Sequence, residues 1–280
     1  MQIRIRETWK VEFLISLMSM FKELVKAEIK ILLKSKFIFI APVLFFFCIE
    51  MLVRFASDID QVLLTLLSIS LYLLPLLALV MGMNGFYSTK DYISLLLSNP
   101  ISRSEVYLSK IFTYIILVSL FFLLGSLPSF LFRFPTLGTE IYKLLYVVAA
   151  SMNVVIFFSC LSVVIGLLVN DKFQGIVVSL TVWFFYAFLF DFILLSIIIY
   201  FRDYEIQKFL LAMIFLNPID LSRIQTLFLL DNPVLLGYTG GLFKSFFEGG
   251  FSIILCFIAN AIWIVLLVYI GKYLFKKKDF

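Results

Sequence analysis

The sequence predicts an all-α membrane protein with six transmembrane helices and with both termini in the cytoplasm. The 280-residue chain is 63% hydrophobic and only 15% charged, whereas soluble domains are about 45–50% apolar and about 25% charged. Six apolar runs reach the roughly 20 residues that a transmembrane helix needs. Lysine and arginine concentrate in alternate connecting segments, as is typical of the cytoplasmic side. This composition excludes a soluble enzyme, a disordered chain and a disulfide-stapled secreted domain.

The six predicted spans are separated by polar or turn-rich segments. They are too long to be β-barrel strands, which alternate in polarity over about 10 residues. With the N-terminus inside, the inner segments hold 16 Lys and Arg and the outer segments hold 6, which explains the net charge of +5 without nucleic-acid binding. The predicted spans are Phe37–Ala56, Val62–Phe86, Ile111–Phe132, Leu144–Val169, Gly175–Phe201 and Phe251–Gly271.

The first 36 residues are predicted to form a cytoplasmic segment that ends in an interfacial helix. Over Phe21–Lys36, apolar residues share one broad face, and Lys22, Lys26 and Lys30 repeat at every fourth position on the other. Such a helix lies in the membrane interface with its lysines toward anionic headgroups. The segment lacks the long apolar run and the cleavage site of a signal peptide. Residues 1–19 show no comparable pattern, so Met18 or Met20 is an alternative start to Met1.

The segment between the second and third spans is predicted to present a short helix to the cytosol. Asp91–Ser98 is apolar but too short to cross a membrane. If Leu95, Leu96 and Leu97 are exposed there, a partner protein is expected to cover them. The alternative is an interfacial helix whose leucines lie in lipid.

The next helix is expected to begin well before the third span. Asn99 and Pro100 break the short helix, because the residue before a proline disfavours helical geometry. Ser102 and Glu105 then have the spacing of a capping box, in which Ser102 is the N-cap.

Three ionisable residues lie within the predicted spans, where charges are costly and are usually paired or functional. Glu50 and Arg54 are four residues apart and can form an ion pair on one helix face. Asp191 lies about 24 Å along the fifth span at about 1.5 Å per residue, near its outer end. It has no partner on its own helix, so it is expected either to pair with another segment or a second copy, or to act in transport.

The outer stretch before the sixth span is predicted to contain two interfacial helices, Ile206–Phe215 and Ile219–Leu230. Asn217 and Pro218 separate them, and Asp220 is the expected N-cap of the second helix. These helices are candidates for docking an extracytoplasmic partner or closing an outer gate.

No catalytic residue and no resident cofactor are expected. The chain has no histidine and no G-x-x-x-x-G-K-[ST] phosphate-binding loop, so it is not expected to hydrolyse ATP itself. Cys48, Cys160 and Cys256 are isolated in apolar runs, which excludes a disulfide framework or a zinc motif. Met81 and Met83 point to different helix faces and are expected to fill the core rather than to bind copper.

Residues 95–103, which read L-L-L-S-N-P-I-S-R, resemble the L-L-S-x-P-[IV]-S-R signature of ABC-2 type permeases. In that family the signature falls on a cytoplasmic coupling helix, which would span residues 89–98 here, and the interfacial helix before the first span is called the elbow helix. The family usually has Gly-Thr where this chain has Asp91 and Tyr92. The resemblance assigns ATPase coupling to Tyr92, Leu95, Leu96, Leu97, Asn99, Pro100, Arg103 and Glu105.

Two further stretches are similar to the NosY-like branch of these permeases. Residues 183–191 resemble its Trp-to-Asp pattern in the fifth span, and residues 216–223 resemble its N-P-x-D-x-x-R motif. The second stretch implies an outer motif made of Asn217, Pro218, Asp220 and Arg223.

The resemblance implies a homodimeric permease in the cytoplasmic (inner) membrane, with two P-loop ATPase subunits that bind ATP and Mg²⁺. ATP hydrolysis would drive substrate export or the motion of a periplasmic β-helix partner, as in copper-centre maturation of nitrous-oxide reductase. The implied organisation is a cytoplasmic segment over 1–36, a permease domain over 37–271 with outer helices over 206–230, and a basic tail over 272–280. The alternative is an ATP-independent secondary transporter or an intramembrane enzyme, although the chain shows no internal repeat.

Overall fold

The computed structural model describes residues 20–34, 37–55, 58–98, 101–133, 141–201, 204, 206–230 and 250–279. Regular secondary structure in these ranges is entirely helical, and a helix over residues 20–32 comes first. The helices that follow are α2 (Phe37–Phe55), α3 (Ile59–Ser88), α4 (Lys90–Leu97), α5 (Arg103–Arg133), α6 (Ile141–Leu168), α7 (Lys172–Phe184), the π-helix η2 (Phe185–Leu189), α8 (Phe190–Tyr200), α9 (Gln207–Ile214), α10 (Pro218–Leu229) and α12 (Gly250–Lys277).

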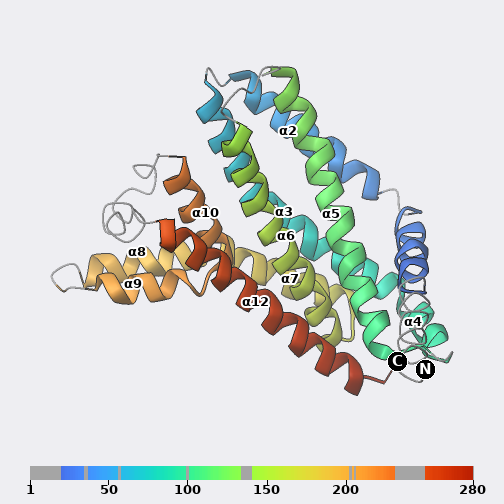
Figure 1. Cartoon of the computed structure of the whole chain (residues 1–280). Helices are drawn as coiled ribbons and strands as arrows, with labels where there is room; N and C mark the ends of the chain where they lie inside the picture. Colours follow the sequence, from blue (N-terminus) through green and yellow to red (C-terminus); the bar gives the residue numbers. More distant parts are fainter. Residues whose placement is uncertain are drawn as a thin grey trace, which may run out of the picture.

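Helices α3 and α6 form the centre of the bundle (Figure 1). They pack along each other, while α2 packs on α5, α12 packs on α6 and α7 packs on α3. Within this chain, 67% of the apolar stretch of α6 is buried, whereas only 22% is buried in both the α7–α8 segment and α12. The α7–α8 segment and α12 therefore lie at the periphery of this chain and present apolar side chains outward.

Small residues let the central helices approach closely. Gly166 of α6 lies against the Phe86 ring of α3, and a Cβ atom on Gly166 would come within 2.8 Å of that ring. The hydroxyls of Ser70 and Ser151 form a hydrogen bond of 2.7 Å between the same two helices. Close backbone approach and interhelical hydrogen bonds hold helices together in lipid. The hydrophobic effect does not drive helix association there, because the lipid tails are as apolar as the helix side chains.

Five helical segments in the described part of the chain are long and apolar enough to cross a membrane, and they coincide with predicted spans two to six. Helix α2 agrees with the first predicted span to within one residue but is not among these five. The chain is thus a multi-pass membrane protein, while the count of six spans and their orientation stay predictions. The fifth predicted span is not one continuous α-helix, because η2 interrupts it between α7 and α8.

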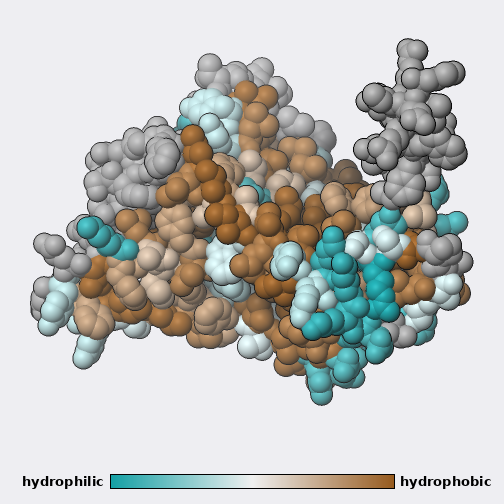
Figure 2. Space-filling model, turned by 60° about the horizontal axis from the view of Figure 1, so that its bottom comes forward, coloured by the Kyte–Doolittle hydropathy of each residue, from teal (hydrophilic) through white to brown (hydrophobic). Residues whose placement is uncertain are grey.

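Two polar contacts mark opposite ends of the bundle. Lys143 at the start of α6 pairs with Asp60 at the start of α3, with 2.9 Å between Nζ and Oδ1. At the opposite side, Lys278 donates to the Leu167 carbonyl at the end of α6. Hydrophilic residues gather on one part of an otherwise apolar surface, at the end that carries α4 and the end of α12 (Figures 1 and 2). The starts of α3 and α6 therefore lie on one side of the bundle, and the ends of α6 and α12 lie on the other.

Helix α10 departs from the prediction of an interfacial helix. It packs against α3, α6 and α12, and Leu221, Gln225 and Thr226 are buried. Together with α8, α9 and α12 it forms a second, smaller apolar core. The outer segment therefore enters the helix bundle instead of lying on it.

Candidate functional site

Helix α4 is a short amphipathic helix attached to one end of the bundle. Ile93 and Leu96 are buried against the core, at 0% and 7% exposure, whereas Leu95 is 61% exposed and Leu97 and Tyr92 are half-buried. The expectation that all three leucines are exposed is therefore wrong for Leu96, which holds α4 to its own chain. Leu95 is the leucine of α4 that faces outward.

The junction between α3 and α4 contains a buried ion pair that the sequence analysis missed. Lys110 of α5 is fully buried and donates to the Glu28 carboxylate at 2.8 Å and to the Thr89 hydroxyl at 2.7 Å. Thr89 is the residue between α3 and α4, and Glu28 lies on the helix over residues 20–32. Burial raises the pKa of the Glu28 carboxyl, with Lys110 acting in the opposite direction. One cation thus ties three segments together beside the expected coupling helix.

A sequence signal for this pair was present. Glu28 is four residues after Leu24 and four before Leu32, so it lies on the apolar face of its helix. Once Ser102 is taken as the start of α5, Lys110 shares a face with Val106. The third predicted span begins at Ile111, so Lys110 falls just outside it.

The start of α5 is capped as predicted and is also joined to the end of α12. The Ser102 hydroxyl accepts a hydrogen bond of 3.2 Å from the Glu105 N–H, which confirms half of the capping box. Arg103 donates from Nη1 to the carbonyls of Lys276 at 3.1 Å and Lys278 at 2.8 Å. A cation is favoured there because the last carbonyls of a helix lack intrahelical partners and carry partial negative charge. Asn99 and Pro100 lie outside the described residues.

The predicted pair in α2 is present. Arg54 Nε donates to Glu50 Oε1 at 3.0 Å, and the Arg54 side chain is largely exposed. The two charges neutralise each other on one helix face.

Asp191 and the outer motif meet in a single network. Arg223 of α10 forms a bidentate pair with the Asp191 carboxylate of α8, with N–O distances of 3.0 and 3.1 Å. The same guanidinium contacts Asp220 at 2.5 Å and donates to the Tyr72 hydroxyl of α3 at 3.1 Å. The expectation that Asp191 pairs with another segment is met within this chain, and one arginine bridges two carboxylates.

Asn217 and Pro218 begin α10 and complete the network. The Asn217 Oδ1 accepts from the Ile219 N–H at 3.0 Å, so Asn217 is the N-cap of α10, and the assignment of that role to Asp220 is wrong. Proline suits the first helical position because its missing N–H would be unpaired there. Asn217 Nδ2 donates to Asp220 Oδ2 at 2.8 Å. Burial raises the pKa of the Asp220 carboxyl to about 7, and the Arg223 charge acts against this.

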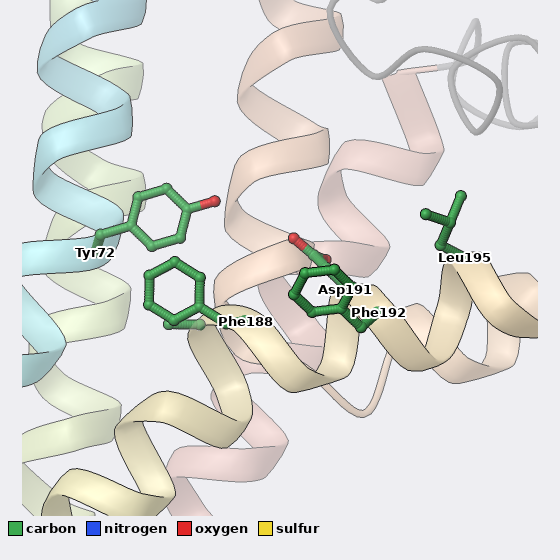
Figure 3. A pocket seen from close by; sticks show the side chains of 6 residues that line it. Tyr72, Phe188, Asp191, Phe192 and Leu195 are labelled. Carbon is green, nitrogen blue, oxygen red and sulfur yellow. The ribbon is translucent and has the colours of Figure 1, made fainter.

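A cavity of about 220 Å³ lies beside the network, where α7 passes through η2 into α8. Its described lining residues are Tyr72, Ala187, Phe188, Asp191, Phe192 and Leu195. Figure 3 shows the helix changing direction here, with the Tyr72 ring over the Phe188 ring. Those two rings stack at 5.6 Å between centroids. Extra backbone in a π-turn re-aims side chains, and such turns are frequent at functional sites.

No group of three or more His, Cys, Asp or Glu in the described part of the chain is arranged to hold a metal ion. Met83 is buried in the core and Met81 packs against it, as expected of residues that fill space.

Comparison with known proteins agrees with this architecture. Residues 12–280 match the model of a family described as ABC-2 family transporter protein. Over 176 residues the chain is 23% identical to the probable ABC transporter permease protein NosY of Stutzerimonas stutzeri. That alignment covers 60% of this chain and 63% of NosY, so the chain matches less than two-thirds of the relative's length.

Proposed function

This chain belongs to the ABC-2 family of transporter proteins, and on that premise we propose that it is a permease subunit driven by a separate ATPase through α4. The observation that carries the proposal is the two-sided construction of α4. Ile93 and Leu96 anchor it in the bundle, and Leu95 projects from it. An exposed apolar side chain on a short helix that is fastened to the spans suits a contact that must transmit force.

The test is ATPase co-purification with a Leu95→Asp variant. A charge at this exposed position is expected to abolish co-purification while leaving the permease folded, because Leu95 does not contribute to the buried core. Leu95→Met is the matched control, since it keeps an apolar side chain of similar volume, and it is expected to retain the ATPase. Leu96→Asp is unsuitable, because it would place a charge in the core. A folded Leu95→Asp variant that binds the ATPase like the wild type would overturn the coupling role.

The assembly is proposed to contain two permease copies and two ATPase subunits in the inner membrane. The α7–α8 segment and α12 expose apolar side chains, which a second copy of the chain or lipid would cover. Native mass spectrometry in detergent is expected to show a permease dimer of twice 32.4 kDa. A monomer in every mild detergent would contradict this arrangement.

The NosY-like resemblance supports a finer proposal, in which the transporter serves copper-centre maturation of nitrous-oxide reductase, together with a periplasmic β-helix partner. Copper would then be cargo, since the described residues contain no cluster of metal ligands. Deletion of the gene is expected to leave nitrous-oxide reductase without its copper centre. Normal copper loading in the deletion strain would exclude this cargo but not the permease function.

The competing function is ATP-independent transport or intramembrane catalysis. It predicts activity from the purified chain in proteoliposomes without an ATPase, driven by an ion gradient in the case of transport. The permease proposal predicts activity only when the ATPase and ATP are present.

A further inference from the structure

The cavity beside η2 has walls that are almost entirely apolar. Tyr72, Phe188 and Phe192 contribute aromatic rings, and Leu195 lies toward its far side in the close-up view (Figure 3). The Asp191 carboxylate is the acidic side chain among the described lining residues, and it is 38% exposed. A carboxylate therefore borders a space that offers little other polar contact.

The charge of the network is not balanced among its described members. Asp191 and Asp220 share one guanidinium, that of Arg223, so the three groups sum to one negative charge when both carboxylates are ionised. Asp220 is only 3% exposed and is further bonded to Asn217, whereas Asp191 opens on the cavity. Above about pH 7, where Asp220 is also ionised, the network carries one surplus negative charge, and Asp191 is its member that borders the cavity.

The chemistry of the walls narrows the class of ligand. Calcium requires 6–8 oxygen ligands and copper(I) prefers sulfur, and the described lining supplies one carboxylate, one phenol and no sulfur. An anion would meet Asp191, and a zwitterion would bring a negative group toward it. Aromatic faces and a carboxylate together suit an organic cation, because both attract positive charge while the rings also accept an apolar body.

We propose that this cavity binds a monovalent organic cation with an apolar body, with its ammonium group at Asp191. The aromatic rings of Tyr72, Phe188 and Phe192 surround the alkyl groups. As a substrate class this inference rests on the proposed permease function, but binding to the chain itself does not require the ATPase. A chain that does not bind the cation would therefore overturn this inference without bearing on the coupling role of α4.

The experiment measures equilibrium binding of radiolabelled benzyltrimethylammonium to the purified full chain in nanodiscs of anionic lipid. Saturable binding is expected, with displacement by the unlabelled cation and none by benzylsulfonate, which has a similar body and the opposite charge. Displacement by phosphatidylcholine would show a lipid headgroup site and would overturn the proposal, as would an absence of saturable binding.

Two variants test the position of the site. Asp191→Asn is expected to weaken binding at least tenfold, because it removes the charge on the cavity wall. Leu195→Trp keeps every charge and is expected to abolish binding by filling the cavity, so the test does not depend on Asp191→Asn folding. Glu50→Gln is the matched control, since Glu50 is a paired carboxylate on a different span, and it is expected to bind like the wild type. Unchanged affinity in folded Leu195→Trp would overturn the assignment.

Discussion

Two ion pairs of the described residues join segments that are far apart in the sequence. Lys110 meets Glu28, 82 positions away, and Arg223 meets Asp191, 32 positions away. Burying an ion is costly, and the cost is offset only where a partner and further hydrogen bonds are present. Each pair therefore holds two distant segments together. Removing one partner tests how much the pair contributes to stability.

Lys110→Met is expected to destabilise the protein by about 3–5 kcal/mol, because it leaves the Glu28 charge buried without a partner. The double variant Glu28→Leu with Lys110→Met is expected to recover most of that loss, since replacing both partners by apolar groups can be nearly neutral. Thermal unfolding of purified variants in detergent measures both effects. If the single and double variants are equally destabilised, the unpaired Glu28 charge is not the cause of the lost stability.

The raised pKa of Asp220 predicts an unusual pH dependence. Its pKa is about 7 in the folded chain against 3.8 as the ordinary value, so the folded state binds its proton more tightly than the unfolded state. The stability from this group is complete below about pH 4 and is lost as pH rises through about 7. Asp220→Asn cannot titrate there, and the difference between its unfolding curve and that of the wild type isolates the effect. A constant difference from pH 5 to pH 8 would contradict the prediction.

At the level of helices, the long spans were predictable and their local features were not. Apolar runs of about 20 residues specify spans whatever their packing, which is why α3, α5, α6 and α12 overlap their predicted spans, although α5 begins eight residues earlier and α12 ends six residues later than predicted. Residues 183–190 read as uniformly apolar, so nothing in their hydropathy distinguishes the π-turn at Phe185–Leu189 from an α-helix.

The candidate site was predictable in its parts but not in its assembly. Asp191 and the N-P-x-D-x-x-R motif were both identified, yet their meeting depends on α10 entering the bundle. The charges of Asp220 and Arg223 gave α10 the polarity of an interfacial helix, whereas in the structure these two residues pair with each other and Arg223 also pairs with Asp191 of α8. The burial of Leu96 was accessible in principle, since Ile93 and Leu96 are three residues apart and share a helix face.

The hydrogen bonds from Arg103 of α5 hold the end of α12 in place. Arg103→Ala removes the donors to the Lys276 and Lys278 carbonyls, so the end of α12 is expected to fray. Hydrogen exchange of backbone amides over residues 270–279 is expected to accelerate about tenfold or more, because hydrogen bonds from charged groups contribute about 1.5–3 kcal/mol. Arg103→Lys keeps the charge but offers a single point of donation, and its exchange is expected to be intermediate. Unaltered exchange in Arg103→Ala would show that other contacts hold this end.

Across the whole molecule, α3 joins the two candidate regions. Thr89 follows its last residue and accepts from Lys110 beside α4, and Tyr72 lies 17 residues earlier and accepts from Arg223 beside the cavity. At about 1.5 Å per residue the two positions are roughly 26 Å apart along one helix. If an ATPase drives α4 as proposed, its motion would reach the cavity along one continuous helix in the centre of the bundle, although Pro75 interrupts the backbone hydrogen bonding of α3 between the two positions.

Tyr72→Phe separates this connection from the binding of the ATPase. The variant keeps the ring stacked on Phe188 and removes the hydroxyl that accepts from Arg223. ATPase co-purification is expected to stay at the wild-type level, because α4 is unchanged, while the stimulation of ATP hydrolysis by the complete transporter falls severalfold. Tyr142→Phe, an exposed tyrosine at the start of α6, is the control and is expected to change neither measurement. If Tyr72→Phe retains full stimulation, α3 does not connect the ATPase to the Arg223 network through this hydrogen bond, and motion must reach the cavity by another helix.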